Sequence, residues 1–265
     1  RVANRFEIPV YPISRGRNWG LGSRVPPQTS VLLDLSGLNR IHELDESLGF
    51  MVIEPGVTFQ QAADFLSEQK SKFFLPVIGG SPLGSVIGNI AERGEGVGPY
   101  GQRLDFVANL EAILANGDCV HTGFGRFEQS TAQHVHRHGV GPSLESLLTQ
   151  SNFGVITRMT VWLTPQPHVL RPFVGQILKR DQLAGVVDAS RDLLLQRVVE
   201  PNGIGIWNSI KISSTMGGYP WQAMENQTPL DPQRYPSEPW IIGGAIYSAS
   251  EAIADATAGH LDSHL

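Results

Sequence analysis

The sequence has little that would tie it to a disulfide framework, a bilayer or a nucleic acid. It contains one cysteine, Cys119, so a disulfide within the chain is excluded and the redox compartment stays open. No apolar run approaches the ~20 residues that a membrane-spanning helix needs. Charged residues make up only 17% of the chain and the net charge is −5, whereas nucleic-acid binders carry an excess of lysine and arginine. We therefore expect neither a nucleic acid nor a membrane as a partner.

What the sequence has in abundance is glycine, with 29 residues that gather in a few segments. The length of 265 residues corresponds to roughly two domains, and Thr164-Pro-Gln-Pro167 is the best candidate for their boundary. Arg1–Phe6 is typical of the last turn of a helix and leads into a strand that ends at Ile13. That order implies an earlier strand and helix, so we expect the sequence to be an internal piece of a longer protein.

Hydrophobic periodicity predicts a helix that begins after Thr58, where Gln61 completes a capping box. Its buried face is expected to hold Phe59, Ala62, Ala63 and Leu66. Other elements expected before the boundary are strands at 10–13, 31–35, 40–45, 50–54, 106–114, 119–122 and 155–163 and a short helix at 144–150. Asn116-Gly117 favours a two-residue hairpin turn.

Beyond the boundary the periodicity changes to alternating strands and helices. Strands are expected at 173–178, 204–212 and 240–247, and helices at 182–195 and 250–265. This order predicts an antiparallel sheet covered by helices. The whole chain is therefore expected to be of the α+β class.

The first glycine cluster, Ser14–Ser23, directly follows the strand that ends at Ile13. Its three glycines let consecutive backbone N–H groups curl around an anion, and Arg15 and Arg17 add positive charge. Gly20-Leu21-Gly22 lacks the third glycine of the dinucleotide fingerprint, and no P-loop lysine is present. The segment is either a pyrophosphate-binding loop or an irregular surface loop.

The second glycine cluster extends over residues 79–89 and continues through 92–101. So many positions without a side chain cost conformational entropy on folding. They are useful where a large flat ligand must lie directly on the backbone, and the alternative is a series of tight turns.

Together these segments resemble the PCMH-type FAD-binding domain of the vanillyl-alcohol oxidase / p-cresol methylhydroxylase (4-cresol dehydrogenase) family. The resemblance rests on the order and spacing of several stretches, which are residues 12–22, 52–59, 86–94, 99–101, 114–118, 141–142 and 149–157. It implies an FAD-binding domain at 1–167 that lacks most of its first strand–helix unit. It also implies part of an antiparallel-sheet substrate (cap) domain at 168–265.

The resemblance implies FAD as the cofactor and assigns its contacts. The first loop would hold the pyrophosphate, the second would line the flavin and ribityl chain, and the strand near residue 155 would pass along the adenine or ribityl side. The residues implied are Arg15, Gly16, Arg17, Asn18, Trp19, Gly20, Gly22, Gly80, Ser81, Gly84, Ser85, Gly88, Asn89, Gly154 and Ile156. We leave the catalytic residues unassigned; Ser81 and Tyr100 are the candidates for that role.

The activity implied is transfer of a hydride from an alcohol or a para-alkylphenol to FAD, with oxygen or a cytochrome as electron acceptor. Members of the family often dimerise, so a homodimer is an expectation. Two alternatives stay open. One is a flavin oxidase of the same fold that acts on a hydroxy acid, a sugar or an amine, and the other is a cofactor-free remnant or binding module.

Three further groups of residues invite a functional interpretation. His134, His136 and His138 alternate, but no Cys, Asp or Glu stands beside them, so we expect a solvated polar loop and assign no metal site. Cys119 is expected to be a small buried hydrophobe. The aromatic residues of the second half would pack in a core or form a substrate wall; they are Trp207, Tyr219, Trp221, Tyr235, Trp240 and Tyr247.

Overall fold

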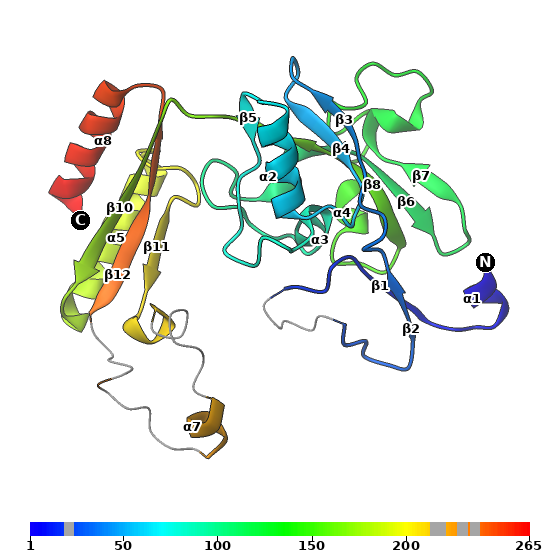
Figure 1. The fold of residues 1–265 in the computed structure, drawn as a ribbon, viewed down its shortest axis with the longest axis horizontal. Helices are drawn as coiled ribbons and strands as arrows, with labels where there is room; N and C mark the ends of the chain where they lie inside the picture. Colours follow the sequence, from blue (N-terminus) through cyan, green and yellow to red (C-terminus); the bar gives the residue numbers. More distant parts are fainter. Residues whose placement is uncertain (19–23, 213–220, 227–232, 234–238) are drawn as a thin grey trace. The chain divides into compact units, whose positions relative to one another are not determined.

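A computed structural model describes residues 1–18, 24–212, 221–226, 233 and 239–265. These residues form two compact units, Arg1–Gln166 and Pro167–Leu265 (Figure 1). Both units combine helices with sheets, and the expected α+β class is confirmed. Among the described residues, every helix is too short or too polar to cross a bilayer.

The first unit opens with a short helix and two paired strands. Helix α1 (Val2–Arg5) leads into β1 (Val10–Ile13), which pairs in parallel with β2 (Val31–Asp34). A five-stranded antiparallel sheet follows, in the order β3-β4-β8-β6-β7. Its strands are β3 (Ile41–Asp45), β4 (Phe50–Ile53), β6 (Val107–Leu114), β7 (Cys119–His121) and β8 (Gly154–Trp162). The two predicted hairpins, β3–β4 and β6–β7, are confirmed.

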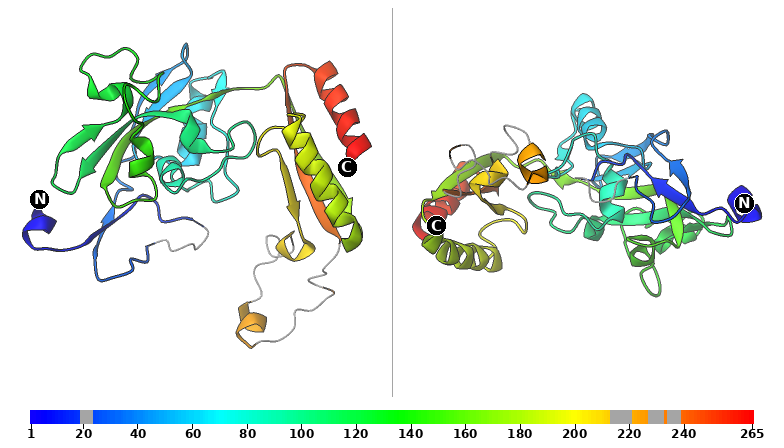
Figure 2. Two further views of the ribbon diagram at one scale, coloured as in Figure 1. Left: turned by 180° about the vertical axis from the view of Figure 1, so that it is seen from behind. Right: turned by 90° about the horizontal axis from the view of Figure 1, so that it is seen from below.

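Two helices pack into the core of this sheet (Figures 1 and 2). Helix α2 (Phe59–Glu68) begins as predicted, because Thr58 Oγ1 accepts a hydrogen bond from the Gln61 N–H at 3.0 Å. It buries Phe59, Ala62 and Leu66 among strand residues such as Met51 and Met159. Helix α3 (Val86–Ala91) buries Val86, Ile87 and Ile90 in the same core.

Two predictions for α2 are wrong: the burial of Ala63, and the return hydrogen bond from the Gln61 side chain that would complete the capping box. Ala63 is exposed, and Phe65 is partly buried against the core instead, so the apolar stripe is centred on Ala62 and Leu66. The Gln61 side chain does not return to its own cap but donates to the Asn39 carbonyl at 2.8 Å.

The turn of the β6–β7 hairpin differs from the prediction. The Leu114 N–H donates to the Asp118 carbonyl, and the Gly117 N–H donates back to Leu114. The loop therefore has three residues, 115–117, and Gly117 takes the positive φ of +90° that such loops require. Cys119 is exposed, not buried, because β7 is the edge strand of the sheet.

The second unit contains the predicted helix-covered antiparallel sheet, in the order β10-β12-β11. Its strands are β10 (Val169–Ile177), β11 (Ile204–Trp207) and β12 (Trp240–Ser248), and its helices include α5 (Leu183–Leu195), α7 (Trp221–Glu225) and α8 (Glu251–His264). Leu193, Ile246, Ala254 and Leu261 form a separate buried cluster.

The strand predicted at 204–212 is too long. It ends at Trp207, and residues 209–212 are helical. The Asn208 side chain explains the change, because its Oδ1 accepts a hydrogen bond from the Lys211 N–H at 2.8 Å and so caps the helical turn.

Short elements complete the described chain. Strands β5 (Phe73–Phe74) and β9 (Thr164–Pro165) pair with each other. The remaining short helices are η1 (Arg103–Phe106), η2 (Gly123–Arg126), α4 (Glu145–Leu148) and η3 (Arg180–Gln182).

Candidate cofactor site

The two glycine-rich segments, far apart in the sequence, lie against each other in the first unit. A Cβ built on Gly88, in α3, would overlap the hydroxyl of Ser14 at the end of β1. A Cβ on Gly84 would lie 3.0 Å from the Ser81 carbonyl oxygen and 3.7 Å from that of Arg17. A side chain at Gly88 would push against Ser14, so glycine permits this close approach, whereas the 3.7 Å from Gly84 to Arg17 is an ordinary van der Waals distance.

The second glycine segment is held by the beginning of α2. The Phe59 N–H donates to the Gly84 carbonyl at 3.1 Å, and the Gln60 N–H donates to the Pro82 carbonyl at 2.9 Å. These donors would otherwise lack partners at a helix start. The N-terminus of α2 therefore orders the loop and is not itself an anion site.

Ser85 fixes the start of α3 in two ways. Its buried hydroxyl accepts a hydrogen bond from the Gly88 N–H at 2.7 Å, which caps the helix, and donates to the Pro55 carbonyl at 2.5 Å. The cap positions Gly88 next to Ser14, where the first glycine loop begins.

The first glycine loop has its own constraints. Gly16 adopts a φ of +58°, and a Cβ there would lie 2.5 Å from Arg24 Nε. Arg15 Nε donates to the Gly56 carbonyl at 2.9 Å, which ties the loop to the segment before α2.

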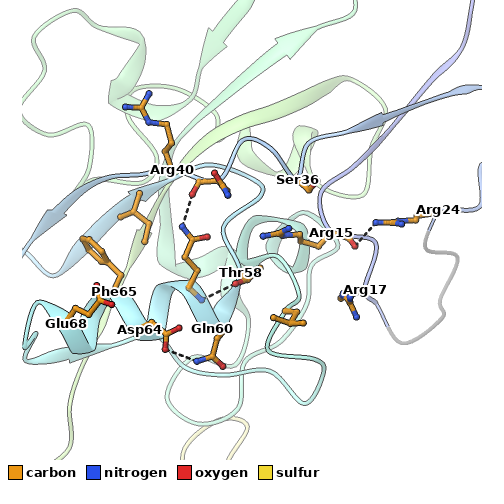
Figure 3. Close-up of a pocket in the computed structure, with 14 residues that line it drawn as sticks. Arg15, Arg17, Arg24, Ser36, Arg40, Thr58, Gln60, Asp64, Phe65 and Glu68 are labelled. Atoms are coloured by element: carbon orange, nitrogen blue, oxygen red, sulfur yellow. Dashed lines mark hydrogen bonds between the residues drawn. The ribbon is translucent and has the colours of Figure 1, made fainter.

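A pocket of about 750 Å³ opens beside this loop (Figure 3). Arg15, Arg17 and Arg24 gather on its loop side, whereas Asp64 and Glu68 line it from α2. Arg40 also lines it. The loop side of the pocket therefore carries the positive charge that phosphate groups require.

Asn89 carries an unsatisfied acceptor. Its side-chain Oδ1 is buried and has no hydrogen-bond partner among the described residues. A Cβ on Gly94 would overlap the same side-chain amide, so the two residues are closely packed. A buried acceptor of this kind costs about 1–3 kcal/mol unless a ligand or water donates to it. The unsatisfied acceptor of Asn89 and the cationic loop are each a feature that fits a polar cofactor such as FAD.

Sequence reasoning missed one buried residue near the site, Arg103. Its guanidinium donates to the carbonyls of Pro76 and Val77, just before the second glycine segment, and lies 4.8 Å from the ring of Phe59. Burial lowers the pKa of Arg103 to about 10. A single arginine at the start of a short helix has no sequence signature that would predict such burial.

The two candidate catalytic hydroxyls both have backbone partners. Tyr100 donates to the Leu163 carbonyl at 2.8 Å and stacks on Phe106 at 3.5 Å, and burial raises the pKa of Tyr100. Ser81 Oγ accepts from the Leu83 N–H at 3.2 Å. In this arrangement both hydroxyls stabilise loops, and their assignment to catalysis stays a prediction.

The remaining predicted cofactor residues fall into three groups. Gly154 and Ile156 lie in β8, where they pair with Leu114 and Ala112, and the Ile156 side chain is buried in the core. Trp19, Gly20 and Gly22 lie outside the described residues. The others lie in the two facing segments; Gly84 and Ser85 are buried, Arg17 is exposed, and Arg15, Gly16, Asn18, Gly80, Ser81, Gly88 and Asn89 are partly buried.

The alternating histidines do not form one solvated loop. His134 is largely buried, stacks on Phe50 at 4.9 Å and hydrogen-bonds Thr160 Oγ1 through Nδ1 at 2.7 Å. Burial lowers the pKa of His134. His136 contacts Phe124 edge-on, and His138 is exposed. The prediction of a polar loop is thus wrong for His134, which has a packing role.

The aromatic residues of the second unit do not share one environment. Trp221 and Trp207 are exposed, whereas Trp240 and Tyr247 are partly buried. Tyr219 and Tyr235 lie outside the described residues.

Comparison with known proteins defines the class of this site. Residues 1–123 match the family described as "FAD binding domain", so the cationic loop and the glycine segments belong to a flavoprotein fold. Residues 1–123 thus form an FAD-binding domain, and the chain is similar to FAD-linked oxidoreductases of the vanillyl-alcohol oxidase / p-cresol methylhydroxylase family.

Three relatives illustrate the similarity. The chain is 40% identical over 259 residues to a 1'-carboxy-chondrochloren decarboxylase of Chondromyces crocatus, covering 95% of this chain and 48% of that protein. It is 34% identical to the 4-cresol dehydrogenase [hydroxylating] flavoprotein subunit of Pseudomonas putida, covering 90% and 44% of the two chains. A 4-ethylphenol oxidase structure from Gulosibacter chungangensis matches all of this chain and 52% of its own, with a TM-score of 0.88 and 27% identity. The chain thus spans about half the length of the relatives it matches.

Proposed function

We propose that this chain is the FAD-binding part of an enzyme that oxidises a para-alkylphenol or a related alcohol. The observation that carries the proposal is the contact between the loop of Arg15 and Arg17 and the glycine segment around Gly84 and Gly88. The loop and Gly88 lie in two of the stretches that resemble the family, residues 12–22 and 86–94, and two of the relatives are named for 4-cresol and 4-ethylphenol.

In this proposal each segment has a distinct task. Arg15 and Arg17 offset the charge of the FAD pyrophosphate, together with backbone N–H groups of the loop that Gly16 shapes. Gly80, Ser81, Gly84, Ser85 and Gly88 let the flavin and ribityl chain lie on the backbone. Asn89 Oδ1 accepts a hydrogen bond from the cofactor. Gly154 and Ile156 contact the cofactor through backbone atoms only.

The domain roles follow the same proposal. Residues 1–167 bind the cofactor, and residues 168–265 form part of the substrate domain. FAD supplies the two-electron redox chemistry when bound. Bound FAD would accept the hydride that the benzylic carbon of the deprotonated phenol gives up, and water would add to the resulting quinone methide. Oxygen or a cytochrome would be the final electron acceptor.

A second candidate function is decarboxylation. The relative with 40% identity is named as a decarboxylase, so loss of a carboxyl group from a related substrate is a specific alternative. With this function, the enzyme would release carbon dioxide from a carboxylated substrate.

The first test is a visible spectrum of the purified chain before and after addition of FAD and desalting. A retained flavin band is expected, and a colourless protein that does not retain added FAD would contradict the proposal. Anaerobic mixing with 4-cresol, 4-ethylphenol, D-lactate and a carboxylated phenol then separates the substrate classes. Bleaching by the alkylphenols supports the first candidate, and carbon dioxide release with the carboxylated phenol supports the second.

A further inference from the structure

The β6–β7 hairpin carries three different metal-ligating side chains on one face. Glu111 of β6 stands directly opposite His121 of β7, and Cys119 lies two residues before His121, so the three share a face. Their oxygen, nitrogen and sulfur atoms all lie within 4.8 Å of one another. Within the described part of the chain, no other three Cys, His, Asp or Glu side chains lie as close.

Neighbouring side chains orient two of these ligands. His121 Nδ1 lies 3.1 Å from Asn109 Oδ1, which accepts only, so Nδ1 carries the proton and the Nε2 lone pair faces Glu111. Glu111 Oε1 accepts from Thr157 Oγ1 at 2.7 Å, which leaves Oε2 turned to His121 at 3.7 Å. Metal-binding histidines and carboxylates usually have such supporting partners.

The distances between the three ligand atoms suit a tetrahedrally coordinated ion after a small side-chain movement. Zinc bonds of about 2.0–2.1 Å to nitrogen or oxygen and about 2.3 Å to sulfur place nitrogen and oxygen ligands roughly 3.3–3.5 Å apart and each of them roughly 3.6 Å from sulfur. The Glu111–His121 pair, at 3.7 Å, needs to close only slightly. Cys119 is exposed at the end of the edge strand, so rotation of its side chain can bring the sulfur closer.

We propose that Glu111, Cys119 and His121 bind a divalent ion of the zinc class. Imidazole, thiolate and carboxylate are the ligands that zinc takes, and three protein ligands leave a fourth position for water. The thiol proton passes to solvent when the ion binds, and no electron is transferred. The ion fastens the edge strand β7 to β6 in the first unit (Figure 1).

Arg158 is the group that opposes this binding. Its Nη1 lies 3.8 Å from Glu111 Oε2, and its side chain is 42% exposed. The guanidinium therefore competes with the ion for the same carboxylate oxygen. Replacement by the neutral Arg158→Gln should tighten metal binding.

Cobalt(II) tests the proposal on the full chain loaded with FAD. Tetrahedral cobalt absorbs at the red end of the visible range, where flavin does not. The thiolate–cobalt charge-transfer band lies in the near-ultraviolet and is read as a difference spectrum against the same FAD-loaded protein without cobalt; it can come only from Cys119, the single cysteine. We expect one cobalt per chain, displaced by zinc. Cys119→Ser should abolish the charge-transfer band, and His121→Ala and Glu111→Gln should each weaken binding at least tenfold.

Two further variants make the test specific. Asn109 has a φ of +43°, so Asn109→Gly removes the partner of His121 without backbone strain, and about tenfold weaker binding is expected. His138→Ala, at an exposed position outside the cluster, should leave binding unchanged. Absence of cobalt bands at twofold excess would overturn the proposal. So would bands that survive both His121→Ala and Glu111→Gln, since these would indicate an adventitious ion on the thiol alone.

Discussion

Gly16 carries a backbone constraint at a single residue of the site. Its φ of +58° is a conformation that L side chains rarely adopt; a Cβ there would also lie 2.5 Å from Nε of Arg24, whose exposed side chain can move away. The backbone constraint acts in the loop that we assign to the pyrophosphate. A substitution at Gly16 therefore tests the loop geometry more directly than removal of any one charge.

We expect Gly16→Val to abolish FAD retention, because the β-branched side chain strains the positive φ by about 1–3 kcal/mol and displaces the loop. The measurement is the flavin-to-protein ratio after FAD loading and desalting. Gly37→Ala is the matched control, since a Cβ at Gly37 meets nothing within 4 Å. Full flavin content in a folded Gly16→Val protein would refute the pyrophosphate assignment.

Some residue-level features could be predicted from the sequence and others could not. Thr58 as a helix cap follows from local spacing, because the hydrogen bond is made within one turn. The exposure of Cys119 depends on the order of strands in the sheet, and the burial of Arg103 depends on carbonyls and a ring from distant segments. The contact of Ser14 with Gly88 has the same non-local origin.

Two serine caps allow helix starts to be compared between the units. Ser85 caps α3 beside the glycine loops, and Ser250 caps α8 in the second unit, where its Oγ accepts from the Ile253 N–H at 3.4 Å. We expect Ser85→Ala to cost about 1–2 kcal/mol of stability and to lower FAD retention, because the hydroxyl also bonds Pro55. Urea unfolding and flavin content measure the two effects.

Ser250→Ala is the control for the Ser85 variant. It removes a cap of the same chemistry from the second unit, so flavin content should stay at the wild-type value. Equal loss of FAD in both variants would show that general destabilisation, and not the position of α3, controls retention.

The β3–β4 hairpin contains a carboxylate that should make stability depend on pH. Burial raises the pKa of Glu54, but hydrogen bonds from the Arg40 N–H at 2.8 Å and from His42 at 2.9 Å outweigh it and lower the pKa below its usual 4.5. A lowered folded-state pKa means that the unfolded chain binds the proton first as the pH falls. The stabilisation is therefore complete above about pH 4.5 and is lost as the pH falls through the folded-state pKa.

Glu54→Gln should remove this part of the acid sensitivity. We expect the variant to be less stable than wild type at neutral pH and to lose less stability between pH 5 and the acid transition, on the order of 1 kcal/mol less. Urea midpoints measured over that pH range provide the comparison. Parallel curves for the two proteins would contradict a lowered Glu54 pKa.

At the level of elements, strands and hairpins were the most predictable features. The apolar run of β4, the alternation along β8, and the periodicity of the helices α2 and α5 were sufficient to locate these elements. The end of β11 was missed because the Asn208 side chain caps a helical turn within an apolar stretch. The turn after β6 was misjudged because Asn116-Gly117 occurs in both two-residue and three-residue loops, and the pairing of Leu114 with Asp118 decides between them.

At the level of the whole molecule, each unit has its own hydrophobic core. The core of the first unit surrounds α2 and α3, and that of the second joins α5, β12 and α8. The proposed FAD contacts all belong to Arg1–Gln166. A ligand stabilises only the folded structure to which it binds, by about 2.7 kcal/mol when its concentration is a hundred times the dissociation constant.

Calorimetry can therefore locate the cofactor site within the chain. We expect two transitions, of which only the one belonging to the first unit moves to higher temperature with saturating FAD, because the second unit contributes none of the proposed contacts. Cleavage in the segment 164–167 by limited proteolysis, followed by mass analysis, identifies which transition belongs to which unit. The Gly16→Val protein should show both transitions without an FAD-dependent shift. A shift of the second transition alone, or an equal shift of both, would mean that the cofactor contacts Pro167–Leu265 and that the assignment to the glycine loops is incomplete.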